Sequence, residues 1–168
     1  MNHAGTITVD QATGGRAIHA TAVLVGETGI VIRGRSGAGK SSLAVALLES
    51  ARAQGLFARL VGDDRVYVAL RNGRLMVTAH PAIAGKIERR GAGIFEVPHE
   101  GRAVVRLVVD LLDAEPGCGI EPRLPSAADR VTTIESANLP RVTLRAGDPA
   151  AELAAQILLE LPPSRTWE

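Results

Sequence analysis

Apolar and polar positions along this chain follow two periods, and their order predicts a mixed α/β fold. Apolar residues recur at helical spacing after Lys40, and Gly55 is placed to end that helix. A second helix is predicted with Asp148 as N-cap, Pro149 as its first residue and Pro162 as its stop. Strands are expected over residues 17–25, 30–33, 57–61, 65–70, 74–78, 104–112 and 141–145.

Turn residues and one long apolar run indicate how these strands are connected. Asn72 and Gly73 separate two short strands, and they favour a hairpin because a type I′ turn needs positive φ at both central residues. Residues 26–29 are also expected to form a turn. The run 104–112 is almost continuously apolar and β-branched, which is typical of a strand buried on both faces. This order favours a sheet with hairpins over a strictly alternating βαβ array.

Length and composition narrow the classes of function. The 168 residues, 46% of them apolar, suit one domain with a real core. We expect that domain over residues 17–161, between a loose segment 1–16 and a tail 162–168. A net charge of +1 and 2% aromatic residues argue against a nucleic-acid partner. A single cysteine and the lack of a membrane span or secretory signal predict a cytoplasmic protein without a membrane partner.

A glycine-rich loop between a predicted strand and a predicted helix carries the clearest chemistry. Residues 34–41 read GRSGAGKS and match G-x-x-x-x-G-K-[ST] at every specified position. Such a loop points successive N–H groups at a polyphosphate, and the helix dipole adds to the attraction. Lys40 would reach the outer phosphates and the Ser41 hydroxyl would bind Mg²⁺. The predicted nucleotide-binding residues are Gly34, Arg35, Ser36, Gly37, Ala38, Gly39, Lys40, Ser41 and Ser42. The alternative is a glycine turn that caps an ordinary helix.

Acidic and basic residues elsewhere carry weaker signals. Asp63 and Asp64 follow a predicted strand, where one carboxylate can hold Mg²⁺ and the other can act as a general base. A pair of turn-capping aspartates is the alternative. His19 lies in an apolar strand, where a histidine is more often a core residue than a catalyst. Glu88 alone indicates only a solvated loop.

The order of these features resembles the catalytic domain of HPr kinase/phosphorylase, most closely the short alphaproteobacterial form that lacks the family's N-terminal domain. His19 is followed by the loop at 34–41, by LVGDD at 60–64 and by IERRGAGI at 87–94. The resemblance covers about residues 17–145. It implies an α/β P-loop kinase fold related to phosphoenolpyruvate carboxykinase, with a mixed sheet, hairpins and flanking helices.

The resemblance also implies an activity and partners. Members of the family use ATP and Mg²⁺ to phosphorylate a serine of HPr, a small carrier protein of the sugar phosphotransferase system, and many also remove that phosphate. We therefore expect a protein serine kinase that acts on an HPr-like carrier. The family tends toward hexamers, so a homo-oligomer is implied.

Roles carried over from the family fall on matching residues of this chain. Lys40 would bind the β and γ phosphates, and Ser41 and Glu88 would contact Mg²⁺, which Asp63 can also hold. The aspartate pair would supply the base that accepts the serine proton, and Asp64 is our choice within it. His19 would tune that aspartate. Arg123, in Arg-Leu-Pro, resembles an arginine that neutralises charge on the transferring phosphoryl group.

The chain also departs from the family pattern. Arg35 is a cation inside the loop, Gly62 replaces an alanine, and Arg89 interrupts an apolar position. The family's late proline-glycine-arginine-asparagine segment, linked with dephosphorylation, is absent, and residues 144–148 read LRAGD. Phosphorylase activity is therefore in doubt. Arg35 and Arg89 motivate a second hypothesis, a nucleotide-binding regulatory module with little turnover. A small-molecule kinase ranks last, because no lid-like domain is evident.

Overall fold

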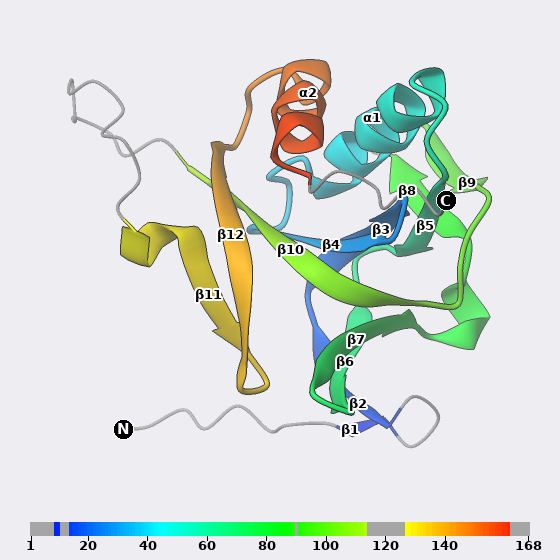
Figure 1. Ribbon diagram of the computed structural model, residues 1–168. Helices are drawn as coiled ribbons and strands as arrows, with labels where there is room; N and C mark the ends of the chain where they lie inside the picture. The colour runs from blue at the N-terminus through cyan, green and yellow to red at the C-terminus, as the bar shows by residue number, and fades with distance from the viewer. Residues whose placement is uncertain (1–8, 11–13, 90, 114–126, 162–168) are drawn as a thin grey trace, which may run out of the picture.

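The computed structural model describes residues 9–10, 14–89, 91–113 and 127–161, which fold around one curled sheet (Figure 1). Two helices, α1 (Lys40–Ala53) and α2 (Ala150–Glu160), pack together on one face of that sheet. The mixed α/β fold expected from the sequence is confirmed. The strands are β1 (Val9–Asp10), β2 (Gly15–Ile18), β3 (Ala20–Val25), β4 (Thr28–Arg33), β5 (Ala58–Gly62), β6 (Val66–Arg71), β7 (Arg74–Ala79), β8 (Lys86–Arg89), β9 (Gly93–Glu96), β10 (Arg102–Leu112), β11 (Val131–Ile134) and β12 (Ala137–Arg145).

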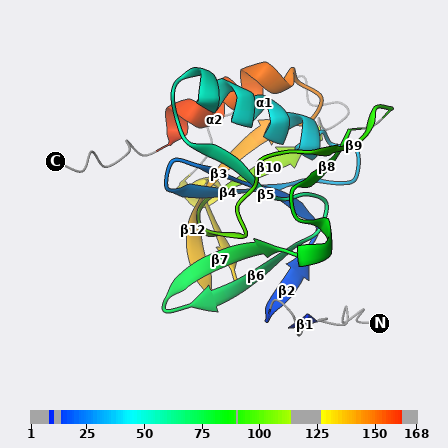
Figure 2. The same cartoon turned by 90° about the vertical axis from the view of Figure 1, so that its right-hand side faces the viewer.

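The long strand β10 organises the main sheet. The strand order is β1-β2-β6-β7-β10-β4-β3-β5, with β12 also paired to β10, and β11 paired to β12. β10 runs antiparallel to β7 but parallel to β4 and β12. The sheet curls so far that β6 and β7 lie across the β3–β4–β5 layer from the helices (Figure 2). β8 and β9 form a separate two-stranded sheet.

A bulge in β10 lets this single strand serve two hydrophobic cores. The pairing with β4 shifts between Val105 and Leu107, so one extra residue lies on the β10 side. Before the bulge, Val105 faces the core enclosed by the curled sheet, whereas beyond it Leu107 and Val109 face the core under the helices. The apolar run read from the sequence is therefore buried on both faces only beyond the bulge. There Val108 faces the core enclosed by the curled sheet and Val109 faces the core under the helices.

Several predicted boundaries are wrong near the N-terminus. The predicted strand 17–25 is two strands, β2 and β3, with a bend at His19 between them. β2 pairs with β6, and β3 with β4 and β5, so the chain changes partners at this bend. The predicted turn 26–29 is shorter, because Thr28 already pairs with Val25. The hairpin at Asn72 and Gly73 is confirmed, and φ is positive at both residues.

Two further differences lie toward the C-terminus. The predicted strand 141–145 is the second half of β12, which pairs with an unpredicted neighbour, β11. Pro149, expected as the first residue of α2, occupies the N-cap position, and no side chain caps the helix. Neither helix in the described part of the chain is long and apolar enough to cross a membrane. The expected tail from Pro162 and the segment 1–8 lie outside the described residues.

A cluster of opposite charges holds together the three parallel strands next to the glycine-rich loop. The Asp110 carboxylate on β10 accepts hydrogen bonds from Arg33 on β4, at 2.7 and 2.8 Å, and from Arg141 on β12, at 2.6 Å. Burial alone would raise the pKa of Asp110, but the hydrogen bonds and charges of Arg33 and then Arg141 outweigh it and hold the pKa below its usual value. Arg33 is the last residue of β4, so this cluster anchors the strand that enters the loop.

We expect Asp110→Asn to lower the free energy of unfolding by about 2–4 kcal/mol, because two mostly buried guanidinium groups lose their counter-charge. Urea unfolding at neutral pH measures this loss. In the matched variant Asp113→Asn, an exposed pair with Arg35 is removed, and the loss should be much smaller because solvent screens that pair.

The pH dependence of the Asp110 contribution follows from its lowered pKa. The ionised carboxylate is favoured in the folded state, so the stabilisation is complete above the unfolded pKa of about 4. It declines as the pH falls through the lower pKa of the folded state. If Asp110→Asn and Asp113→Asn lowered the free energy of unfolding by the same amount at neutral pH, the structural role given to Asp110 would be contradicted.

Candidate active site

Three strand ends bring the predicted site residues to one edge of the sheet. β3 lies between β4 and β5 and runs antiparallel to both. The start of β3 therefore lies beside the ends of its two neighbours, as the pair Ala20–Arg33 illustrates. The glycine-rich loop leaves β4 at this edge, close to the bend at His19 and to Asp63, which follows β5.

The backbone of the loop explains two of its glycines. Gly39 is the N-cap of α1 with φ at 97°, a conformation that a residue with a Cβ rarely adopts. A Cβ at Gly34 would lie 3.1 Å from the carbonyl oxygen of Leu111 on β10. The first turn of α1 has no side-chain cap and no acidic residue. Its N–H groups and dipole are thus arranged for an anion from elsewhere, as the motif predicts.

Lys40 lies inside the loop with its ammonium group directed at three acceptors. Its Nζ lies 3.1 Å from the carbonyl oxygen of Gly34, 3.0 Å from that of Arg35 and 2.9 Å from Nε2 of His19. The residue is only 6% exposed. A buried ammonium group next to the N–H groups of a helix start makes this loop a strongly attractive place for phosphate oxygens.

Asp63 is buried beside the loop and accepts hydrogen bonds from three different elements. The Thr21 hydroxyl of β3 donates to its Oδ1 at 2.7 Å, and the Ser41 hydroxyl of α1 lies 2.9 and 3.1 Å from its two oxygens. The backbone N–H of Glu88 on β8 donates to Oδ2 at 3.1 Å. These donors fix the orientation of the carboxylate and place it directly against the serine of the loop.

Asp64 has the opposite environment. Its side chain is 77% exposed, and its backbone has φ at 63°, in the left-handed region. Its Oδ1 lies 3.3 Å from Nδ1 of His19, whose Nε2 contacts Lys40. An ammonium group can only donate, so Nε2 must accept, and a neutral imidazole then carries its proton on Nδ1, facing Asp64. His19 therefore connects Lys40 to Asp64 rather than filling the core.

These residues surround a cavity of about 380 Å³. Most predicted site residues line it, whereas Gly34, Arg35 and Ala38 do not. The Arg35 guanidinium instead donates to the Asp113 carboxylate at 2.5 Å, and this pair raises the pKa of Arg35. Arg123 lies outside the described residues. The lining residues are His19, Ser36, Gly37, Gly39, Lys40, Ser41, Ser42, Asp63, Asp64 and Glu88.

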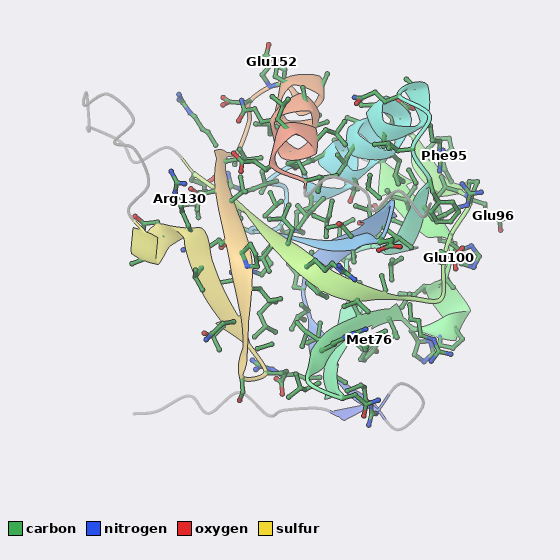
Figure 3. The ribbon with its side chains drawn as sticks, viewed as in Figure 1. Met76, Phe95, Glu96, Glu100, Arg130 and Glu152 are labelled. Carbon is green, nitrogen blue, oxygen red and sulfur yellow. The ribbon has the colours of Figure 1, made fainter. Side chains whose placement is uncertain are left out.

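A larger cavity, of about 670 Å³, lies on β6, β7 and β10, next to Met76 (Figure 3). None of the predicted site residues lines it. The size of a cavity alone therefore does not identify the site, and the convergence of a phosphate loop with carboxylates does.

Thr21 is the site residue that sequence reasoning missed. It is fully buried on β3, and its hydroxyl donates the shortest of the hydrogen bonds to Asp63. A threonine within an apolar strand also suits ordinary sheet packing, so its sequence context carries no signal. Only the pairing of β3 with β5, which brings Thr21 beside Asp63, gives it a role.

Comparison with known proteins places this fold and site in context. The family model "HPr Serine kinase C-terminal domain" matches residues 10–148. The HPr kinase/phosphorylase of Mycoplasma mycoides subsp. mycoides is 32% identical over 102 residues, which cover 56% of this chain and 31% of the relative. The HPr kinase/phosphorylase of Chloroherpeton thalassium is 37% identical over 110 residues, which cover 59% of this chain and 30% of the relative. The chain thus spans about a third of these curated relatives.

A solved structure shares the fold. The Hpr(Ser) kinase/phosphatase from Coxiella burnetii superposes with a TM-score of 0.69 at 22% identity, over 86% of this chain and 95% of the other. At that identity the likeness concerns the fold, which is the P-loop kinase fold expected from the sequence.

We expect Thr21→Val to lower the free energy of unfolding by about 1.5–3 kcal/mol, since a buried carboxylate loses a charge-assisted hydrogen bond. Thr133→Val is the matched control, because the Thr133 hydroxyl donates at the same 2.7 Å distance to the neutral amide oxygen of Asn138 on the surface. That variant should lose less than about 1 kcal/mol. Urea unfolding of both variants measures the difference, and equal losses would argue against a special role for Thr21.

Proposed function

The chain belongs to the family of HPr serine kinase C-terminal domains, and we propose that it transfers the γ-phosphoryl group of ATP to a serine of an HPr-like carrier protein. The observation that carries this proposal is the meeting of a phosphate loop, a buried carboxylate and an exposed carboxylate in one cavity. The curated relatives are named HPr kinase/phosphorylase. Because the chain spans about a third of their length, their activity is transferred here as a proposal.

Mg²⁺ is the metal that the donor atoms of this site fit. The Asp63 carboxylate and the Ser41 hydroxyl lie in contact, and both offer the hard oxygen ligands that Mg²⁺ prefers. Glu88 lines the same cavity and is the third proposed ligand. One or two protein carboxylates suffice when nucleotide phosphates complete the shell. Bound there, the ion would neutralise charge on the β and γ phosphates, which the loop and Lys40 hold in place.

Asp64 is the proposed general base. Asp63 already accepts three hydrogen bonds, whereas the Asp64 carboxylate is exposed to an approaching protein and pairs with His19. In the proposed reaction, the serine oxygen bonds to the γ phosphorus as the bond to the bridging oxygen of ADP breaks. The serine proton passes to an Asp64 oxygen. His19, with its Nδ1 proton directed at Asp64, orients that carboxylate.

The forward direction is the one that we propose. The loop between β12 and α2 contains Ala146 and Gly147 in place of the family segment linked with dephosphorylation, so phosphorylase activity is not included. The role of Arg123 at the transferring phosphoryl group, a homo-oligomeric state and a cytoplasmic location all stay predictions.

The proposal is tested by incubating the purified chain with Mg²⁺, γ-labelled ATP and the HPr-like carrier of its own organism. The carrier should be labelled on serine. Asp64→Asn should lower the transfer rate by about 10²–10⁴-fold because the serine proton loses its acceptor. The affinity for ATP should change little, because the Asp64 side chain pairs with His19, which lies outside the loop.

Lys40→Ala is the control for the phosphate loop, and it should lose both ATP affinity and transfer. Full-rate transfer by Asp64→Asn would remove that residue from the role of base. An unlabelled carrier despite tight ATP binding by the natural chain would favour the regulatory module over the kinase.

A further inference from the structure

A second cavity, of about 220 Å³, adjoins the glycine-rich loop on the side away from Asp63. It shares Gly37, Gly39 and Ser42 with the cavity that contains Asp63 and Asp64. Its other walls are the end of β10, the turn after β12 and the first residues of α2. β4, which leads into the loop, lies between β10 and β3 in the sheet. The cavity with Asp63 lies on the β3 side of the loop and the second cavity lies on the β10 side, so the two flank the loop.

We propose that this second cavity receives the nucleoside half of the nucleotide. The inference rests on the proposed function, since it assumes that a nucleoside triphosphate binds to the loop. The outer phosphates would lie with Lys40 and Ser41, and the chain of phosphates would pass Ser42, which lines both cavities, before the ribose and base enter the second one. Together the two cavities reach the size of roughly 300–1,000 Å³ that is usual for small-molecule sites.

The lining of the second cavity suits a base and a sugar. Its inner wall is apolar and is formed by Leu43, Leu111 and Leu153, all of them buried. Apolar side chains match the faces of an aromatic base, whose burial is favourable. The outer rim carries Arg35 and Asp113, which form an ion pair. A guanidinium plane can stack on a base, and a carboxylate can accept hydrogen bonds from ribose hydroxyls.

Charge also determines which half of the nucleotide fits this cavity. Its lining carries the carboxylates of Asp113 and Asp148 but only the one guanidinium of Arg35, which pairs with Asp113, so the net charge left on the lining is negative and disfavours phosphate groups. The uncharged nucleoside escapes that repulsion, whereas the phosphates are attracted to Lys40 on the other side of the loop. The same arrangement explains why Arg35, although it belongs to the loop motif, faces away from the phosphate cavity.

Ala150, the first residue of α2, offers a way to fill the second cavity without touching the phosphate loop. It lines the cavity and is half-buried, whereas the next residue, Ala151, is exposed and does not line it. Glu152 is also exposed and points outward from α2 (Figure 3). Ala150→Phe therefore places a ring where we locate the nucleoside, and Ala151→Phe is the matched control.

The test compares the affinity of each protein for ATP and for inorganic tripolyphosphate, both with Mg²⁺, by calorimetry. The natural chain and Ala151→Phe should bind ATP at least about tenfold more tightly than tripolyphosphate. Ala150→Phe should remove that preference by weakening ATP while leaving tripolyphosphate within about twofold. Thermal unfolding checks that the variant is folded, and the smaller substitution Ala150→Val should reduce the preference in part.

The outcomes separate the two proposals. If tripolyphosphate and ATP bind but Ala150→Phe and Ala150→Val keep the full preference for ATP, the nucleoside lies elsewhere and only this inference is overturned. An equal affinity of the natural chain for the two ligands also overturns it. If neither ligand binds to the natural chain, the phosphate loop is not a nucleotide site, and the proposed function falls together with the inference.

Discussion

The buried carboxylate of Asp63 is the interaction on which the rest of the site depends. A carboxylate that is 7% exposed destabilises the fold unless polar partners surround it. Those partners are Thr21 of β3, Ser41 of α1 and the backbone of Glu88 on β8, three elements far apart in the sequence. The hydrogen bonds that compensate for burial therefore also join these elements around the phosphate loop. Stability and the proposed metal site rest on the same contacts.

The two adjacent aspartates illustrate how one turn can supply two kinds of carboxylate. The left-handed backbone at Asp64 turns the chain after β5, so that Asp63 points into the protein and Asp64 faces solvent. One carboxylate is immobilised by donors, and the other is accessible to a protein substrate. Arg33 and Asp110 brace the neighbouring strands at the base of the loop. The site is thus built on rigid strand ends, which suits a reaction that depends on positioning.

Local signals in the sequence predicted the loop, its helix and the aspartate pair, because those features depend on neighbouring residues. Features that depend on pairing between distant strands were missed. The bend at His19 exists because the chain passes from β6 to β4 as its partner, and Thr21 gains its role only through the approach of β5. The change of face in β10 follows from a bulge that an apolar run does not reveal. Sequence alone thus named most of the residues that line the cavity, but not the strand pairing that brings them together.

The most direct test is a crystal structure with a non-hydrolysable ATP analogue and Mn²⁺, a Mg²⁺ substitute located by its anomalous scattering. The proposed site predicts phosphates held by the N–H groups of residues 36–41 and a metal peak bonded to oxygen atoms of Ser41 and Asp63. Phosphates bound away from the loop, or a metal with no bond to Asp63, would contradict it.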